Sequence, residues 1–195
     1  KGSIITKLGL EKQGFKIVNS DISLEWLKKN SGLPADMRDL TKEQRSTLGK
    51  LGAQARKIAR GKMMKYQGEG DGVIVDGTGG SAKQMQKLVD EFKNKGYDVS
   101  MMFVETSLDI ALERNRNRKE RTLLDKVVER SWQAVMDNLK TYKSMFGSNF
   151  VEVSTEGKET DKLPSGVKSG INKFLRKPPK NKVAKKWLKH ARELL

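Results

Sequence analysis

Short apolar runs that alternate with amphipathic segments constrain the fold of this chain more than any other feature. The predicted strands span residues 15–20, 72–77, 98–106 and 149–154. Thr41 and Ser81 each stand at the predicted start of a helical segment, and Gln84 occupies the capping-box position after Ser81. Further helices are predicted through residues 127–139 and 167–175. Strand and helix in alternation predict an α/β fold with a mostly parallel sheet that helices cover on both faces.

Two of the strands contain nearly continuous apolar runs, VIV and MMFV. Such runs are typical of central strands that are buried on both faces. A sheet in which these strands are central needs a fifth strand. Pro178 and Pro179 then end the domain. We therefore predict a domain over residues 1–176 and a separate tail over residues 177–195.

The charge of the chain is strongly positive and unevenly distributed. The sequence has 40 Lys and Arg residues against 24 Asp and Glu residues, for a net charge of +16. Residues 168–195 alone contribute ten Lys or Arg and one Glu. This balance favours a polyanionic partner such as nucleic acid, nucleotide phosphates or an anionic surface. The amphipathic segment Lys180–Leu195 either binds nucleic acid, a protein partner or a membrane surface, or packs on its own domain.

Several kinds of site are excluded by composition. The chain has no cysteine, which rules out disulfides and thiolate metal sites, and its single histidine, His190, argues against a histidine-built metal site. No apolar run approaches the roughly 18 residues that a membrane span requires. We therefore expect a soluble intracellular protein, cytoplasmic or virion-associated, whose chemistry depends on Asp, Glu, Lys, Arg, Ser and Thr.

Acidic residues follow the predicted strands at the positions where each strand ends. Asp21 follows the first strand, Asp76 the second and Glu105 the third. In an open parallel sheet, ligands bind in the crevice at the carboxyl ends of the strands. These side chains are therefore candidates for a common site, although Asp21 could equally be the cap of the helix that follows it.

Two basic features fit phosphate chemistry. The chain begins Lys1–Gly2–Ser3 and then continues as a helix, which resembles the last part of a phosphate-binding loop, although three residues can match by chance. The segment SLDIALERNRNRKER places Arg114, Arg116, Arg118 and Arg121 close together. Arginine is suited to stabilising a transferring phosphoryl group, but a solvated basic helix would have the same composition.

Taken in order, the segments KGS, IVNSD, VIVDGTG and ALERNRNRKERTLLDKVVERSW make the chain similar to a known family. It resembles the zeta-toxin and polynucleotide-kinase group of P-loop kinases, particularly kinase-like proteins of large tailed bacteriophages, over residues 1–154. The resemblance implies a P-loop NTPase three-layer sandwich with strand order 2-3-1-4-5. It also implies ATP and Mg²⁺ as cofactors.

The resemblance assigns roles to individual residues. Lys1 and Gly2 would contact the phosphates of the nucleotide, while Ser3 and Asp76 would hold the metal. Asp21 would accept the proton of the attacking hydroxyl. The residues implied to form an arginine lid over the phosphates are Arg114, Arg118 and Arg121.

The sequence departs from that family at its beginning, because no residue precedes the loop lysine. The strand that leads into the loop lies in the middle of the sheet in that family, so its absence would leave unpaired strand edges. We therefore expect the natural chain to continue upstream of Lys1.

Two classes of function stay open. One is an ATP-dependent kinase that transfers a phosphoryl group to a hydroxyl of a nucleotide, sugar nucleotide or polynucleotide. The other is a non-catalytic structural or interaction protein that keeps a kinase-like fold, for example a virion component. Arg38, Arg45 and Arg56 are candidate anion contacts between the first two strands, but they do not specify the acceptor.

Overall fold

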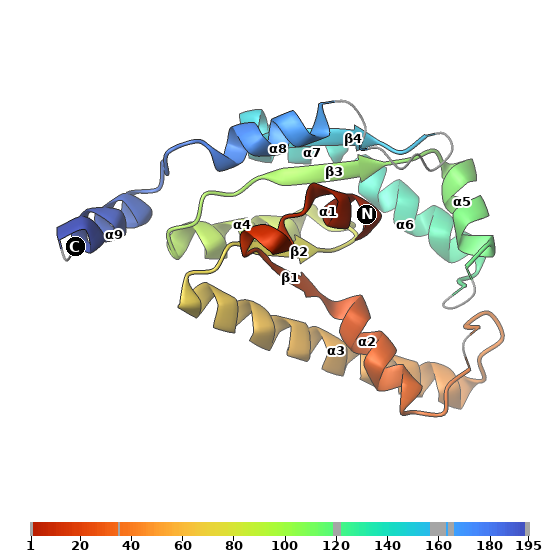
Figure 1. Cartoon of the computed structure of the whole chain (residues 1–195). Coiled ribbons are helices and arrows are strands. Elements are labelled where there is room, and N and C mark those ends of the chain that lie inside the picture. Colours follow the sequence, from red (N-terminus) through yellow and green to blue (C-terminus); the bar gives the residue numbers. More distant parts are fainter. Residues whose placement is uncertain (1, 35, 119–121, 157–162, 164–165, 194–195) are drawn as a thin grey trace. The chain divides into compact units, whose positions relative to one another are not determined.

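The computed structural model of the chain describes residues 2–34, 36–118, 122–156, 163 and 166–193 (Figure 1). The chain folds as two compact units, one formed by Lys1–Thr78 with Leu108–Ser131 and the other by Gly79–Ser107 with Trp132–Leu195. Each unit contains one pair of parallel strands. Among the described residues, no helix combines the length and apolar character that a membrane span requires.

The first unit contains the first two strands and most of the predicted site. Its elements are α1 (Gly2–Leu8), η1 (Glu11–Gln13), β1 (Lys16–Asn19), α2 (Ser20–Lys29), α3 (Lys42–Glu69), β2 (Val73–Asp76), α5 (Leu108–Arg116) and the first part of α6 (Asp125–Asp137). Helix α3 packs against α2 and against both strands. The predicted start of α3 at Thr41 is confirmed, because Thr41 and Gln44 form a complete capping box.

Strand β2 is less buried than its apolar sequence predicts. The side chain of Val75 is 40% exposed, although the VIV run indicates burial on both faces. In the part of the chain that the structure describes, β2 pairs with β1 alone. In the predicted order 2-3-1-4-5, strand 1 is the strand that leads into the phosphate-binding loop, so β1 and β2 correspond to strands 2 and 3, and β3 and β4 to strands 4 and 5. The two observed pairings, β1 with β2 and β3 with β4, are compatible with that order, and the complete order stays a prediction.

The second unit is built around the parallel pair β3 and β4. Its elements are α4 (Ala82–Asn94), β3 (Met101–Glu105), the remainder of α6, α7 (Leu139–Phe146), η2 (Gly147–Asn149), β4 (Phe150–Ser154), α8 (Val167–Leu175) and α9 (Lys182–Glu193). The parallel direction of both strand pairs and the helices between them confirm the predicted α/β class.

Helices cover both faces of the β3–β4 pair. Phe150 packs with the buried cluster that includes Val89 of α4 and Tyr142 of α7. The next residue, Val151, points to the opposite face, because successive side chains of a strand alternate. There it meets α8 at Gly170, where an added Cβ would lie 3.1 Å from Val151 Cγ2. This unit therefore has three layers, with the strand pair in the middle.

The predicted helix over residues 127–139 is divided in the structure. Helix α6 ends at Asp137 and α7 begins at Leu139. The side chain of Asn138 explains the break, because its Nδ2 donates to the carbonyl of Ala134 at 2.8 Å. A side chain that takes the carbonyl four residues earlier competes with the helical backbone bond.

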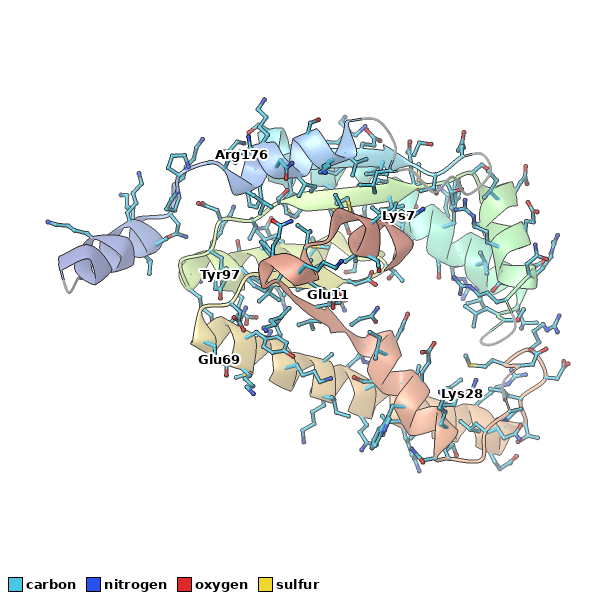
Figure 2. All side chains as sticks on the ribbon, viewed as in Figure 1. Lys7, Glu11, Lys28, Glu69, Tyr97 and Arg176 are labelled. Atoms are coloured by element: carbon cyan, nitrogen blue, oxygen red, sulfur yellow. The ribbon has the colours of Figure 1, made fainter. Side chains whose placement is uncertain are left out.

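The start of α9 is attached to the end of α4 within the second unit. Asn181 Nδ2 donates to the Lys93 carbonyl at 2.7 Å, and the Lys180 backbone N–H donates to Asp98 Oδ2 at 2.8 Å. Nearby, the ring of Tyr97, labelled in Figure 2, packs edge-on against Phe92 with ring centroids 5.2 Å apart. These contacts fix where the basic tail begins, whereas the partner of its remainder stays a prediction.

Candidate functional site

The carboxyl ends of β1 and β2 bring two polar side chains together. The strands pair in a register that sets Asn19 opposite Asp76, so both side chains leave the same face of the pair. Asn19 Nδ2 donates to Asp76 Oδ2 at 2.8 Å, and both residues are partly buried. This contact joins residues 57 positions apart and fixes the orientation of the Asp76 carboxylate.

Asn19 also organises the start of α2. Its Oδ1 accepts a hydrogen bond from the Asp21 backbone N–H at 2.7 Å, which makes Asn19 the N-cap of the helix. The interpretation of Asp21 as the helix cap is therefore wrong. Asp21 lies in the first helical turn with an exposed side chain, at the same end of the strand pair as Asp76.

A hollow of about 550 Å³ in the first unit extends along β1 to this pair of side chains. Asn19 and Asp76 line it together with apolar, polar and charged side chains, namely those of Ile5, Thr6, Glu11, Phe15, Lys16, Ile17, Ile22 and Tyr66. Small-molecule sites are concave and combine apolar side chains with a few polar groups. The Asn19–Asp76 pair is thus accessible to a ligand in the hollow.

The oxygen ligands at the carboxyl end of β1 and β2 fit a Mg²⁺ ion whose other ligands are mainly phosphates. Among the described residues, no group of three or more His, Cys, Asp and Glu side chains could hold a metal. Mg²⁺ is usually bound through one or two carboxylates together with substrate phosphates and water. An ionised carboxylate accepts about four hydrogen bonds, and the bond from Asn19 is one of those that Asp76 accepts. Asp76 is the residue of this end that would hold the metal.

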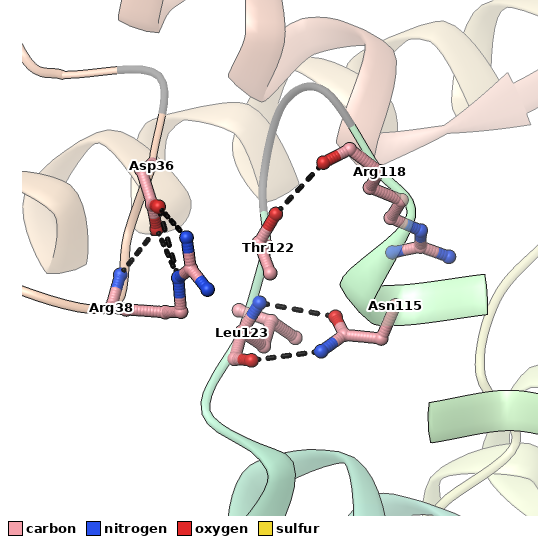
Figure 3. A network of polar contacts seen from close by, with 6 residues as sticks. All are labelled: Asp36, Arg38, Asn115, Arg118, Thr122 and Leu123. Carbon is pink, nitrogen blue, oxygen red and sulfur yellow. Dashed lines mark hydrogen bonds and ion pairs between the residues drawn. The ribbon is translucent and has the colours of Figure 1, made fainter. Parts of the chain in front are cut away.

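The arginine-rich segment after α5 is closed by a side-chain clamp (Figure 3). Asn115 is 3% exposed; its Nδ2 donates to the Leu123 carbonyl at 2.8 Å and its Oδ1 accepts from the Leu123 N–H at 3.0 Å. Thr122 Oγ1 donates to the Arg118 carbonyl at 3.0 Å inside the same loop. The side-chain amide of Asn115 thus binds the backbone N–H and C=O of Leu123, as a paired strand would. It joins the two ends of the segment that carries Arg118.

Two ion pairs flank this clamp. Arg116 pairs with Asp125, and this hydrogen bond raises the pKa of the Arg116 guanidinium. Arg38 pairs with Asp36 through both carboxylate oxygens. The side-chain and backbone hydrogen bonds from Arg38 lower the Asp36 pKa from 3.8 to about 2. Because Arg38 is engaged with Asp36, it is a weaker candidate for an anion contact than its sequence position indicates.

We expect Asn115→Ala to destabilise the protein by about 1–3 kcal/mol, because it leaves the Leu123 N–H and C=O without these partners. Chemical denaturation measures the loss, and amide hydrogen exchange at Leu123 should accelerate. The matched control is Asn117→Ala, since Asn117 is exposed and lies two residues further along. Equal losses in the two variants, or unchanged protection at Leu123, would show that the clamp is not stabilising.

The structure describes some of the predicted site residues and omits others. Lys1 and Arg121 lie outside the described residues. The backbone of Gly2 and Ser3 begins α1, while the side chain of Ser3 lies outside the described part. The catalytic, nucleotide-binding and metal roles of the described residues stay predictions. Those residues are Asp21, Asp76, Arg114 and Arg118.

Sequence reasoning missed two residues that organise the site, Asn19 and Asn115. A signal for Asn19 exists, because an asparagine one position before a helix is a preferred cap. Its bond to Asp76 depends on strand register, which the sequence does not specify. Asn115 lies among arginines, and nothing in its neighbourhood distinguishes it from an exposed polar residue.

Comparison with known proteins gives one family. The family described as the AAA domain, a P-loop NTPase-like domain of kinase type, matches residues 3–142. The matched region includes both strands of the first unit, β3 of the second unit and the arginine-rich segment. No curated protein matches the chain.

Proposed function

Because the chain belongs to the AAA domain family over residues 3–142, we propose that it is an ATP-dependent kinase that transfers the γ-phosphoryl group of ATP to a hydroxyl. The family includes P-loop kinases and supports nucleotide binding, usually with Mg²⁺. The observation that carries the proposal is the contact of Asn19 with Asp76 at the end of β1 and β2, beside which Asp21 begins α2. Within kinases, we propose the zeta-toxin and polynucleotide-kinase group, which the sequence motifs resemble.

In the proposed reaction, Asp21 is the general base. Its exposed carboxylate takes the proton of the acceptor hydroxyl as the hydroxyl oxygen bonds to the γ-phosphorus. The bond from the γ-phosphorus to the β,γ-bridging oxygen breaks, and ADP leaves with that electron pair. The Asn19 cap holds the backbone of Asp21 in the first helical turn, which fixes the position from which the carboxylate extends.

The remaining residues bind and stabilise charge. Mg²⁺, when bound, neutralises charge on the β- and γ-phosphates, and Asp76, oriented by Asn19, would hold it. Lys1, Gly2 and Ser3 would contact the phosphates at the start of α1. Arg118, together with Arg114 and Arg121, would stabilise the negative charge of the transferring group. Arg118 lies between Asn115 and Leu123, which two hydrogen bonds join.

The proposal is tested with the full-length product of the gene and γ-labelled ATP. We expect Mg²⁺-dependent transfer of the label to a hydroxyl acceptor from a panel of nucleosides, sugar nucleotides and oligonucleotides with free 5′ ends. A protein that neither binds nor hydrolyses any nucleotide, yet assembles stably with a partner through Lys180–Leu195, would support the structural alternative instead.

A further inference from the structure

The long helix α3 carries a concentration of positive charge that the proposed reaction does not use. Residues 44–68 contain seven basic residues and no Asp or Glu. All seven are exposed, and they are Arg45, Lys50, Arg56, Lys57, Arg60, Lys62 and Lys65. Acidic residues occur in this helix only near its two ends, at Glu43 and at Glu69, which Figure 2 labels. Interspersed acidic residues, which soluble helices commonly carry, are therefore missing from 25 consecutive positions.

Three of the seven basic residues lie on the side of the helix that faces away from its buried residues. Ala55, Ala59, Met63 and Gln67 form a buried stripe at four-residue spacing. On the side of the helix away from these buried residues, a second row of residues recurs at alternating spacings of four and three, and all of its members are exposed. We call it the α3 stripe, and it consists of Ser46, Lys50, Ala53, Lys57, Arg60 and Met64.

The dimensions of α3 suit an extended polyanion. The helix has 28 residues and is therefore about 42 Å long. Its seven cations span the 20 positions between Arg45 and Lys65, or about 30 Å. Duplex DNA carries one negative charge per about 1.7 Å of its axis. The three cations on the outward side of the helix, Lys50, Lys57 and Arg60, span ten positions, or about 15 Å, and can neutralise several phosphates at once.

The same stripe is poorly suited to other anionic partners. A helix that lies on a membrane inserts Trp, Phe or Leu from an apolar face. The α3 stripe offers Met64 as its single large apolar side chain, and the other large apolar residues of α3 are buried or partly buried. A protein partner would normally find aromatic or aliphatic anchors at the centre of its interface. Charge without apolar anchors favours a partner that is bound through phosphates alone.

We propose that the α3 stripe binds the phosphate backbone of a nucleic acid. Lys50, Lys57 and Arg60 contact successive phosphates, and the small side chains of Ser46 and Ala53 let the backbone lie close to the helix. This binding is independent of sequence, because backbone contacts carry no base information. It goes beyond the proposed kinase function and does not depend on it.

The test uses a fluorescently labelled 20-nucleotide single strand and the corresponding duplex with the full-length gene product, by anisotropy between 50 and 200 mM salt. We expect the variant Lys50→Gln/Lys57→Gln/Arg60→Gln to bind at least about tenfold more weakly at low salt. Its salt slope should fall by about 2–3, because each lost phosphate contact accounts for about 0.7–0.9 of that slope. Glutamine is a good helix former, so circular dichroism should show an unchanged helix content.

Three comparisons decide the outcome. The charge-conserving variant Lys50→Arg/Lys57→Arg/Arg60→Lys should bind like the unmodified protein. Neutralising three exposed lysines of α4, in Lys83→Gln/Lys87→Gln/Lys93→Gln, removes the same net charge and should have a much smaller effect. An equal effect of that control would overturn the proposal, because net charge alone would then explain binding.

Two further outcomes would also overturn it. One is loss of binding only when the tail lysines are neutralised, in Lys182→Gln/Lys185→Gln/Lys186→Gln. The other is tight binding to phosphatidylserine vesicles that the α3 variant abolishes, with no binding to either oligonucleotide. Retained binding after loss of the tail charges, and its loss after neutralisation of the α3 stripe, would support the proposal.

Discussion

Replacing Asp21 with asparagine is expected to lower the rate of phosphoryl transfer by ~10²–10⁴-fold and to leave ATP binding nearly unchanged. The carboxylate is the proposed base for the acceptor hydroxyl, and asparagine cannot take that proton at neutral pH. The helix cap survives the substitution, because Asn19 accepts from the backbone N–H of residue 21 and not from its side chain. Single-turnover transfer to the identified acceptor measures the rate, and equilibrium titration with ATP measures binding.

A matched control separates catalysis from helix stability. Asp21 and Glu43 both lie in the first turn of a helix, where a negative side chain interacts favourably with the helix dipole by about 0.3–1 kcal/mol. Glu43→Gln removes the same kind of charge from α3 and should leave transfer unchanged. Full phosphoryl transfer by Asp21→Asn would contradict the assignment of Asp21 as the base.

Replacing Asp76 with asparagine is expected to weaken Mg²⁺-dependent nucleotide binding by at least about 10–100-fold, because that is the usual cost of losing even a residue that only orients a metal ligand. The side chain keeps its size, and an amide at position 76 can still accept from Asn19 Nδ2. Asp76→Asn therefore removes the negative charge of the side chain, while the pairing of β1 with β2 should survive. Titration with a fluorescent ATP analogue at several Mg²⁺ concentrations measures the effect.

The control for this variant is Asp90→Asn on α4, which neutralises an exposed carboxylate of the second unit. It should leave the Mg²⁺ dependence unchanged. If Asp76→Asn binds the nucleotide with the same Mg²⁺ dependence as the unmodified protein, Asp76 does not hold the metal.

The local structure of this chain could be predicted where short-range signals decide it. All four strands occur within the predicted ranges, and Thr41 and Ser81 are N-caps as expected. Caps and strands depend on residues that are neighbours in the sequence, so periodicity and side-chain chemistry identify them. The break at Asn138 is the exception, because its side-chain bond to Ala134 competes with a helix that the apolar pattern supports.

The organisation of the site could not be predicted, because it depends on contacts between distant residues. The bond between Asn19 and Asp76 requires the exact register of two strands, and a shift of one residue would turn one side chain to the other face. The Asn115 clamp likewise requires the chain to return to α5 after the arginine-rich loop. The exposure of Val75 depends on which elements cover its face of the strand pair, and its apolar neighbours do not indicate this.

Paramagnetic broadening by Mn²⁺ bound with a non-hydrolysable ATP analogue tests the location of the nucleotide most directly. In the full-length, nitrogen-labelled gene product, amide signals of residues 18–21 and 75–78 should broaden most, while those of residues 182–186 stay sharp. Asp76→Asn should greatly reduce the broadening. Tight binding of the Mn²⁺ nucleotide with sharp signals at residues 18–21 and 75–78 would contradict a nucleotide site at the end of β1 and β2.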